Sequence, residues 1–103
     1  MERKFEIEFV NPVEDIEDDN IDIFIKFDTG EAYAATVFTP KNILTLMNRW
    51  KQSGECLGGS YFWVEDMIIV ERLTMDIVHD AVNAVIESGK LEKAFILMDT
   101  SED

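Results

Sequence analysis

Hydrophobic and polar residues alternate along the first third of the chain, which is the pattern of half-buried β-strands. Residues 5–9 read Phe-Glu-Ile-Glu-Phe, and Asn11-Pro12 follows as a stop. Residues 21–28 alternate most clearly, with isoleucine or phenylalanine at every odd position. The segment 28–31, Asp-Thr-Gly-Glu, is typical of a tight turn. Residues 32–38 should therefore return as a third strand, completing an antiparallel meander.

The connection between the first two expected strands is dominated by acids. Residues 13–20 read Val-Glu-Asp-Ile-Glu-Asp-Asp-Asn. A turn of helix after Pro12 also fits this segment, because proline suits the first helical position and acids suit the first turn.

Two later segments have helical spacing of their apolar residues. The first begins at Thr39 as N-cap and Pro40 as first residue, and its apolar stripe is Ile43, Leu44, Leu46, Met47 and Trp50. Gly54 is expected to end it, and residues 53–60 are expected to form a loop. The second helix begins after Thr74, and Gly89 is expected to end it.

Residues 61–70 are strand material interrupted by Glu65-Asp66. Adjacent strand residues face opposite sides, so one of these acids would point into the core. A tight turn, a bulge or a kink would relieve this conflict, and the sequence favours a bulge or kink. A last strand is expected over residues 93–98, followed by a frayed acidic tail from about residue 99.

These elements predict one globular domain, residues 1–103, of the α+β class. We expect a mostly antiparallel sheet of five to six strands with two helices packed on one face, in the order βββ-α-β(β)-α-β. The opposite face would be partly solvated. It would be lined by Glu6, Glu8, Asp22, Lys26 and Asp28.

Charge narrows the range of partners. The 103 residues include 22 Asp and Glu against 9 Lys and Arg, a formal net charge of −13. Direct binding to nucleic acid or to an anionic membrane is therefore not expected, because both require basic residues. An acidic surface keeps a protein dissolved, and it also attracts a basic protein partner. Both interpretations remain open.

Cysteine content and hydropathy favour a cytoplasmic protein. Cys56 is the single cysteine, so no internal disulfide forms. The first residues lack the apolar run of a signal peptide, and no apolar stretch approaches the length of a membrane span.

The candidate chemistry is sparse. His79 is the single histidine, and we expect it on the flank or exposed side of its helix, solvated or paired with Asp76. One cysteine and one histidine cannot form a structural zinc site. The acids of residues 14–19 lack the spacing of a calcium loop, and the glycines of residues 54–59 are not followed by a phosphate-loop lysine. We therefore expect no catalytic residues, no metal and no cofactor. We expect that the protein is not an enzyme.

A binding surface would combine acids with an apolar anchor. The acids of residues 14–19 and of the 65–66 pair interrupt strand structure at points where neutral residues would serve folding better. Phe24 lies on a strand whose other face is expected to be buried. The predicted partner-binding residues are Glu14, Asp15, Glu17, Asp18, Asp19, Asp22, Phe24, Glu65 and Asp66.

One segment resembles a known group of proteins. Residues 61–71, Tyr-Phe-Trp-Val-Glu-Asp-Met-Ile-Ile-Val-Glu, with Leu73-Thr74, look like a motif of small bacterial proteins. The chain also resembles, in size and acidity, the immunity proteins of contact-dependent and related polymorphic toxin systems. That resemblance implies binding and neutralisation of a toxin nuclease domain, often a basic RNase or DNase. It assigns no binding residue.

The sequence thus predicts an acidic protein-binding module, and most concretely an immunity protein for a basic toxin nuclease domain. A homo-oligomeric or scaffold protein of the bacterial cytoplasm is the alternative, and a homodimer is compatible with either. A small enzyme that uses carboxylates with His79 is the third hypothesis.

Overall fold

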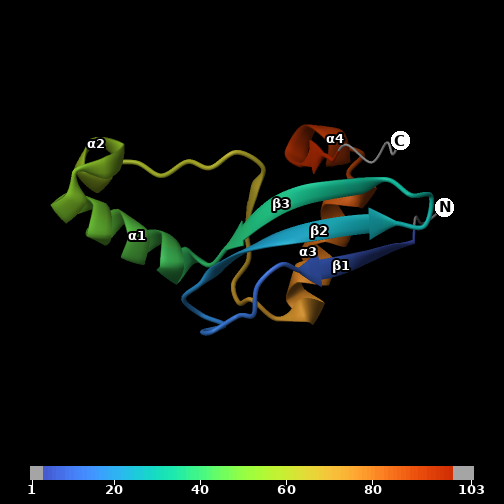
Figure 1. Ribbon diagram of the computed structural model, residues 1–103, viewed down its shortest axis with the longest axis horizontal. Coiled ribbons are helices and arrows are strands. Elements are labelled where there is room, and N and C mark those ends of the chain that lie inside the picture. The colour runs from blue at the N-terminus through green and yellow to red at the C-terminus, as the bar shows by residue number, and fades with distance from the viewer. Residues whose placement is uncertain (1–3, 99–103) are drawn as a thin grey trace.

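The structure, a computed structural model, describes residues 4–98 (Figure 1). The expected acidic tail falls on residues 99–103, outside the described residues. The strands are β1 (Phe5–Phe9), β2 (Asn20–Phe27), β3 (Ala32–Phe38), β4 (Met67–Ile69) and β5 (Ile96–Leu97). The helices are α1 (Pro40–Ser53), α2 (Glu55–Gly59), α3 (Met75–Glu87) and α4 (Leu91–Ala94).

The sheet confirms the predicted class and element order. β1, β2 and β3 form the antiparallel meander, with Glu8 opposite Phe24 and Phe24 opposite Ala34. β4 joins the far side of β3 in parallel through Thr36 to Phe38. β5 pairs antiparallel with the beginning of β3 on that same side. The protein is therefore α+β with a mostly antiparallel five-stranded sheet.

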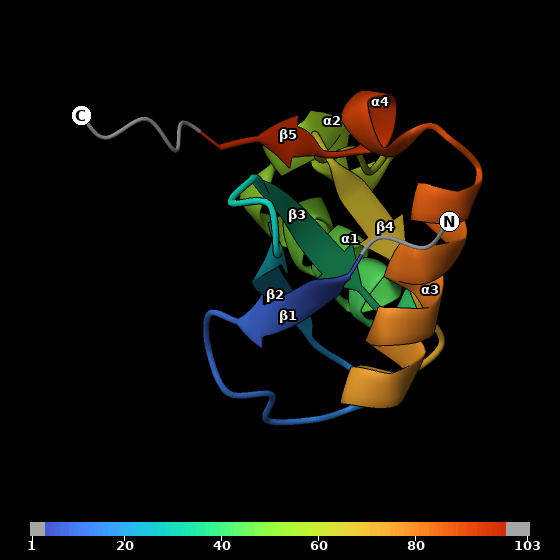
Figure 2. The ribbon, with the colours of Figure 1, turned by 90° about the vertical axis from the view of Figure 1, so that its right-hand side faces the viewer.

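The core lies between one face of the sheet and α3. The odd-numbered residues of β2 and β3 are almost completely buried, and Val78 and Val82 of α3 pack against them. Leu91 and Phe95 close the core beyond the end of α3. Figure 2 shows α3 on one side of the strands, whereas the opposite side carries no helix. That uncovered side is the solvated face that the alternation of residues predicts.

The position of α1 differs from the expected packing of two helices on one face. α1 extends beyond the end of the sheet, away from α3 (Figure 1). Asn42 is its one buried residue, and its apolar stripe is half-buried, except for the exposed Leu44. Helical spacing reveals an apolar side of a helix but does not reveal what covers that side.

The ends of α1 form as the sequence predicts. The Thr39 hydroxyl accepts a hydrogen bond from the Asn42 backbone N–H at 3.2 Å, and Pro40 occupies the first turn. Gly54 ends the helix in the left-handed conformation, with its N–H bonded to the Trp50 carbonyl.

After Gly54 the expected loop is a short helical segment, α2, that reverses the chain. Gly59 lies against α1 so closely that a Cβ atom there would come within 2.1 Å of the Met47 carbonyl oxygen. The Phe62 ring then stacks on Trp50 at 5.5 Å and meets Phe38 edge-on at 4.9 Å. The arm, defined as residues 40–64, is thus a helix with a returning segment packed along it.

Two expected strands are shorter in the structure. Residues 61–64 form no strand, because Phe62 packs on α1 instead of extending the sheet. The chain turns at Glu65 and Asp66, with Asp66 left-handed at φ 54°, and β4 begins directly afterwards. Near the end of the chain, the expected strand 93–98 is replaced by α4 and the two-residue β5, since Leu91 and Phe95 are buried at helical spacing.

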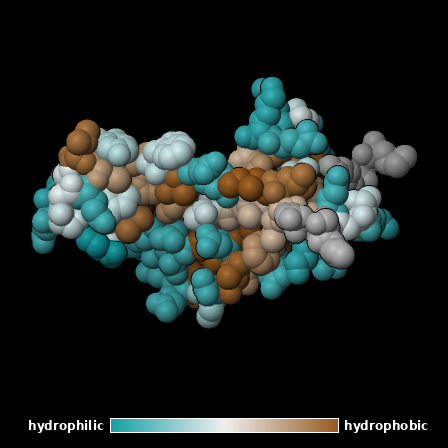
Figure 3. Space-filling model, turned by 45° about the horizontal axis from the view of Figure 1, so that its top comes forward, coloured by the Kyte–Doolittle hydropathy of each residue, from teal (hydrophilic) through white to brown (hydrophobic). Residues whose placement is uncertain are grey.

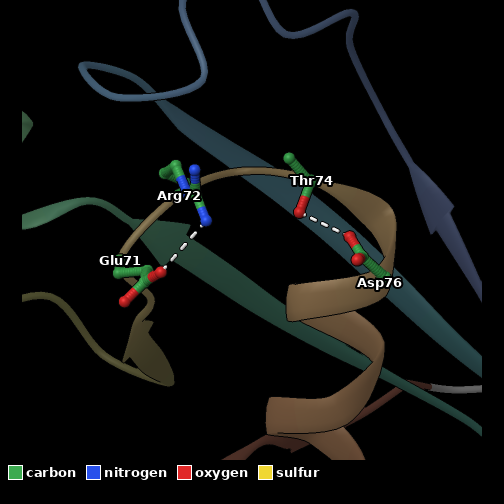
Figure 4. A network of polar contacts seen from close by, with 4 residues as sticks. All are labelled: Glu71, Arg72, Thr74 and Asp76. Carbon is green, nitrogen blue, oxygen red and sulfur yellow. Dashed lines mark hydrogen bonds and ion pairs between the residues drawn. The ribbon is translucent and has the colours of Figure 1, made fainter.

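The entry into α3 is held by short-range polar contacts (Figure 4). Thr74 is the N-cap residue, but its hydroxyl donates to the Asp76 carboxylate at 2.6 Å. This hydrogen bond, with a further one from the Ile77 backbone, lowers the pKa of Asp76. Arg72 pairs with the adjacent Glu71 at 3.2 Å. No helix within residues 4–98 has the length and apolar character needed to cross a membrane.

Candidate protein-binding surface

The uncovered side of the sheet presents the even-numbered residues of β1, β2 and β3. Strand register aligns them in rows across the sheet. One row runs Asp22, Thr36, Met67, and a second runs Glu8, Phe24, Ala34, Ile96. We call this surface the open face. It consists of Glu6, Glu8, Asp22, Phe24, Lys26, Ala34, Thr36, Met67 and Ile96, with Glu65 and Asp66 at its margin.

Acids gather where the first row meets the turn before β4. The Asp22 carboxylate accepts a hydrogen bond from the Thr36 hydroxyl at 2.9 Å. The Thr36 backbone N–H in turn donates to the Asp66 carbonyl at 3.1 Å. Partial burial, and then the negative charges of Glu65 and Asp22, raise the pKa of Asp66. Three predicted site acids are therefore close enough to repel one another, and a basic side chain would relieve that repulsion.

Apolar groups lie beside these acids. Phe24 is half-buried in the middle of the open face, next to Ala34. Ile96 of β5 is 44% exposed, and Ile69 of β4 is 49% exposed. In Figure 3 hydrophobic surface covers part of the sheet region, with hydrophilic residues on either side. An apolar centre with a charged rim is the usual anatomy of a protein interface.

The open face has one lysine among its residues. Lys26 forms an ion pair with Glu8 at 2.5 Å across β1 and β2, and both side chains are about half exposed. This pair neutralises one acid at the β1 edge. Glu6, Asp22, Glu65 and Asp66 are left to give the face its negative charge.

The acidic loop, residues 14–19, is built differently from the open face. The Asp18 carboxylate accepts hydrogen bonds from the Asn42 amide and the Thr45 hydroxyl of α1, each at 3.1 Å. Asp19 accepts from the Glu14 backbone N–H at 3.0 Å, and Asp15 accepts from that of Glu17 at 3.0 Å. Contrary to the prediction from the sequence, neutral residues in this loop would therefore not serve folding better. Three of its carboxylates shape the loop and fix α1.

The nine predicted residues thus fall into two groups. Asp22, Phe24, Glu65 and Asp66 come together on the open face. Of the loop acids, Asp18 bonds to α1, whereas Asp15 and Asp19 accept hydrogen bonds from backbone N–H groups within the loop. The Ile16 carbonyl accepts from the Leu73 backbone N–H ahead of α3. In this loop Glu14 and Glu17 are exposed, and their side chains have no hydrogen bond or ion pair among the described residues.

The sequence interpretation missed the exposed apolar residues at the far edge of the sheet. Ile96 lies in an apolar run, Ala94 to Met98, which predicts a buried strand. A two-residue strand at an edge leaves such side chains in solvent. No pattern in this run distinguishes an edge strand from a central one, although its shortness and its closeness to the acidic tail are consistent with an edge.

His79 lies outside the open face, on α3. Its ring stacks on Phe5 at 4.6 Å, and its Nδ1 is 4.0 Å from the Asp80 carboxylate, not paired with Asp76. It borders a cavity of about 650 Å³ that is also lined by Lys4, Phe5, Glu6, Lys26, Phe27, Asp28 and Asn83. Within the described chain these lining residues include no serine, threonine or cysteine that could serve as a nucleophile.

Metal ligation and similarity to other proteins add no further assignment. Among residues 4–98 no group of three or more His, Cys, Asp or Glu side chains is placed to hold a metal ion. The sequence matches no family model, and no curated protein or solved structure is significantly similar to it.

Proposed function

We propose that this protein is an acidic protein-binding module whose open face binds a basic protein. The observation that supports this most directly is the grouping on one uncovered face of Asp22, Glu65 and Asp66 beside Phe24. A face of this kind offers carboxylates to Lys and Arg side chains and an apolar centre that excludes water.

The net charge supports the same proposal through association kinetics. A chain of net charge −13 attracts a basic partner over distances longer than any direct contact. Such steering raises the association rate, and the contacts at the interface then set the dissociation rate. The raised pKa of Asp66 adds to this, since a cation beside it would relieve the repulsion from Glu65 and Asp22.

The most concrete form of the proposal is an immunity protein that neutralises a toxin nuclease domain. Nucleases are basic because their substrate is anionic, so carboxylates can take the place of phosphates in the substrate cleft. The resemblance of residues 61–71 to small bacterial proteins, together with size and acidity, supports this form. The gene immediately upstream of this one would then encode a large secreted protein with a basic C-terminal domain.

The test measures binding of that basic domain to two variants with equal changes in charge. One variant, Asp22→Asn with Glu65→Gln and Asp66→Asn, neutralises the open face. The other neutralises Asp80, Glu87 and Glu92, which are exposed on α3 and α4. We expect the open-face variant to weaken binding at least about tenfold and the control variant to change it little.

Co-expression gives the functional readout. The wild-type protein should restore growth of cells that express the basic domain, and the open-face variant should protect them less. Equal weakening by the two variants would mean that total charge and not the open face determines binding. A protein that recovers only acidic or neutral partners from its source cell would contradict the proposal as a whole.

A further inference from the structure

The arm differs in charge from the rest of the protein. Residues 40–64 contain Lys41, Arg49 and Lys51, with Glu55 as the single acid, a net charge of +2 in a chain whose total is −13. All three bases are exposed. Figure 1 shows α1 and α2 lying beyond the end of the sheet, so the last turn of α1, which carries Arg49 and Lys51, lies away from the open face.

The arm also exposes large apolar side chains. Leu57 is 82% exposed and Trp63 67% exposed, with Leu44 and Tyr61 about half exposed or more. Figure 3 shows a hydrophobic end on the arm, separate from the hydrophobic surface over the sheet. Solvent-exposed side chains of this size, gathered on 25 residues, indicate a contact surface.

The backbone of α2 holds this surface in a strained form. Cys56 and Leu57 are both left-handed, with φ of 50° and 54°, a conformation that residues other than glycine rarely adopt. Strain of this kind is commonly found at binding and switch sites. At Leu57 the strain places a leucine side chain in solvent, which serves neither the helix nor the core.

We propose that the arm docks on the open face of a second copy of this protein. The arm supplies lysine, arginine and apolar side chains, and the open face supplies acids, Phe24 and Ile96. Each copy carries both surfaces, so a twofold axis would pair each arm with the opposite open face, as isologous dimers require. Charge complementarity selects this occupant, because the arm's positive charge matches an acidic surface that every copy presents.

This inference extends the proposed function and uses the same face. The open face would be covered by arms in the free protein, and a basic partner would bind in their place. Self-association is measured with the protein alone, so its failure leaves the binding of a basic partner untouched. Conversely, if the protein forms a dimer but binds no basic protein, this inference is supported and the proposed function fails.

The test compares variants at one ionic strength, because salt screens both the overall repulsion between copies and the local attraction between the arm and the open face. Light scattering and equilibrium ultracentrifugation of the wild-type chain at high micromolar concentration should give twice its 11.9 kDa. Arg49→Glu with Lys51→Glu on the arm should weaken association at least about tenfold. Lys90→Glu with Lys93→Glu, next to and within α4, makes the same change of about −4 in net charge and should leave association near the wild-type value.

Leu57→Asn provides a second variant with a different chemistry. Asparagine tolerates the left-handed conformation, so this change keeps the turn while removing the apolar side chain. It should weaken association without lowering the melting temperature of the monomer, measured at a concentration where the protein does not associate. A monomeric wild-type protein, or equal weakening by the two charge-reversal pairs, or unchanged association of Leu57→Asn, would overturn the proposal.

Discussion

Three residues other than glycine are left-handed within the described chain, namely Cys56, Leu57 and Asp66. Each precedes a change in chain direction. Cys56 and Leu57 reverse the chain at the end of the arm, and Asp66 lies in the turn directly before β4. The Cys56 thiol also lies beside the Tyr61 hydroxyl and raises the pKa of that group. These conformations are unfavourable locally, so the surrounding structure must impose them.

Replacing Leu57 by asparagine should therefore stabilise the monomer. Leu57 is mostly exposed, so little burial is lost, and asparagine adopts this conformation more readily. We expect the free energy of unfolding to rise by about 1 kcal/mol in urea titrations at a concentration where the protein is monomeric. Leu44→Asn, in regular helix, is the control and should not stabilise. Destabilisation by Leu57→Asn would mean that Leu57 packs within its own chain.

Asp66 predicts a pH dependence of stability. Its pKa is raised, chiefly by burial and then by Glu65 and Asp22, so its charged form is disfavoured in the folded protein. Because the folded protein favours the neutral carboxyl group, Asp66 costs no stability at low pH, where it is protonated in both states. The protein loses stability as pH rises through the folded pKa, since the side chain must then ionise in the folded state.

Asp66→Asn should accordingly raise the free energy of unfolding at pH 7 by about 0.5 kcal/mol, and with it the melting temperature. The effect at pH 4 should be smaller. Thermal unfolding at the two pH values measures this difference. Asp80→Asn removes an exposed charge elsewhere and is the control. A larger gain at pH 4 than at pH 7 would show the opposite sign.

At the scale of elements, the acidic loop and α1 form one unit. Asp18 receives two side-chain hydrogen bonds from α1, and the Asn20 amide donates to the Asn42 amide oxygen at 2.8 Å. Thr39, fully buried, accepts from the Asp19 backbone N–H at 3.4 Å. The loop therefore positions the beginning of the arm relative to the sheet.

Asp18→Ala should destabilise the protein by about 1–2 kcal/mol, because it leaves the Asn42 and Thr45 donors without their acceptor. Glu17→Ala, an exposed acid of the same loop, should change the free energy of unfolding by less than about 0.5 kcal/mol. Denaturant titration of both variants decides the matter. Equal and small effects of the two substitutions would mean that Asp18 is not needed for folding and is available to bind a partner.

Local sequence signals, such as alternation, turn residues and helix caps, predicted several helices and strands well. The alternation in β2, the turn at Gly30, the cap at Thr39 and the stop at Gly54 all lie within a few residues of the structure they specify. Such signals act over short distances, so neighbouring residues suffice to identify them.

Packing over longer distances was not predictable in the same way. Phe62 is in a run that favours a strand, yet its ring packs on Trp50, which comes twelve residues earlier. Asp18 bonds to residues more than 20 positions later. For the candidate surface, alternation identified Asp22 and Phe24 as neighbours of one face, but Ile96 joins that face through pairing with Ala34, which the sequence does not show.

At the scale of the whole molecule, the dominant property is unbalanced negative charge. The ion pairs among described side chains are few and exposed, and the Lys26–Glu8 pair joins two strands. The principal dimensions are 46 × 29 × 25 Å. The screening length falls from about 30 Å at 0.01 M salt to about 8 Å at 0.15 M, so repulsion acts across the molecule only at low salt.

Adding sodium chloride over this range should therefore stabilise the protein. Weaker self-repulsion should add about 1 kcal/mol, which is roughly 4–8 °C in Tm for a domain of this size. Differential scanning calorimetry measures the shift, and sulfate salts are avoided because they strengthen apolar burial by exclusion. A Tm that falls with added chloride would mean that attractive surface pairs outweigh the repulsion.

We propose that the open face binds a basic protein by charge and apolar contact together. The most direct test is the association rate with the basic domain that we propose is encoded upstream, measured by stopped flow at low and physiological salt. We expect a fast rate at low salt that falls steeply with added salt. For Asp22→Asn with Glu65→Gln and Asp66→Asn we expect a lower rate with a shallower salt dependence. A rate that is independent of salt and identical in this variant would contradict it.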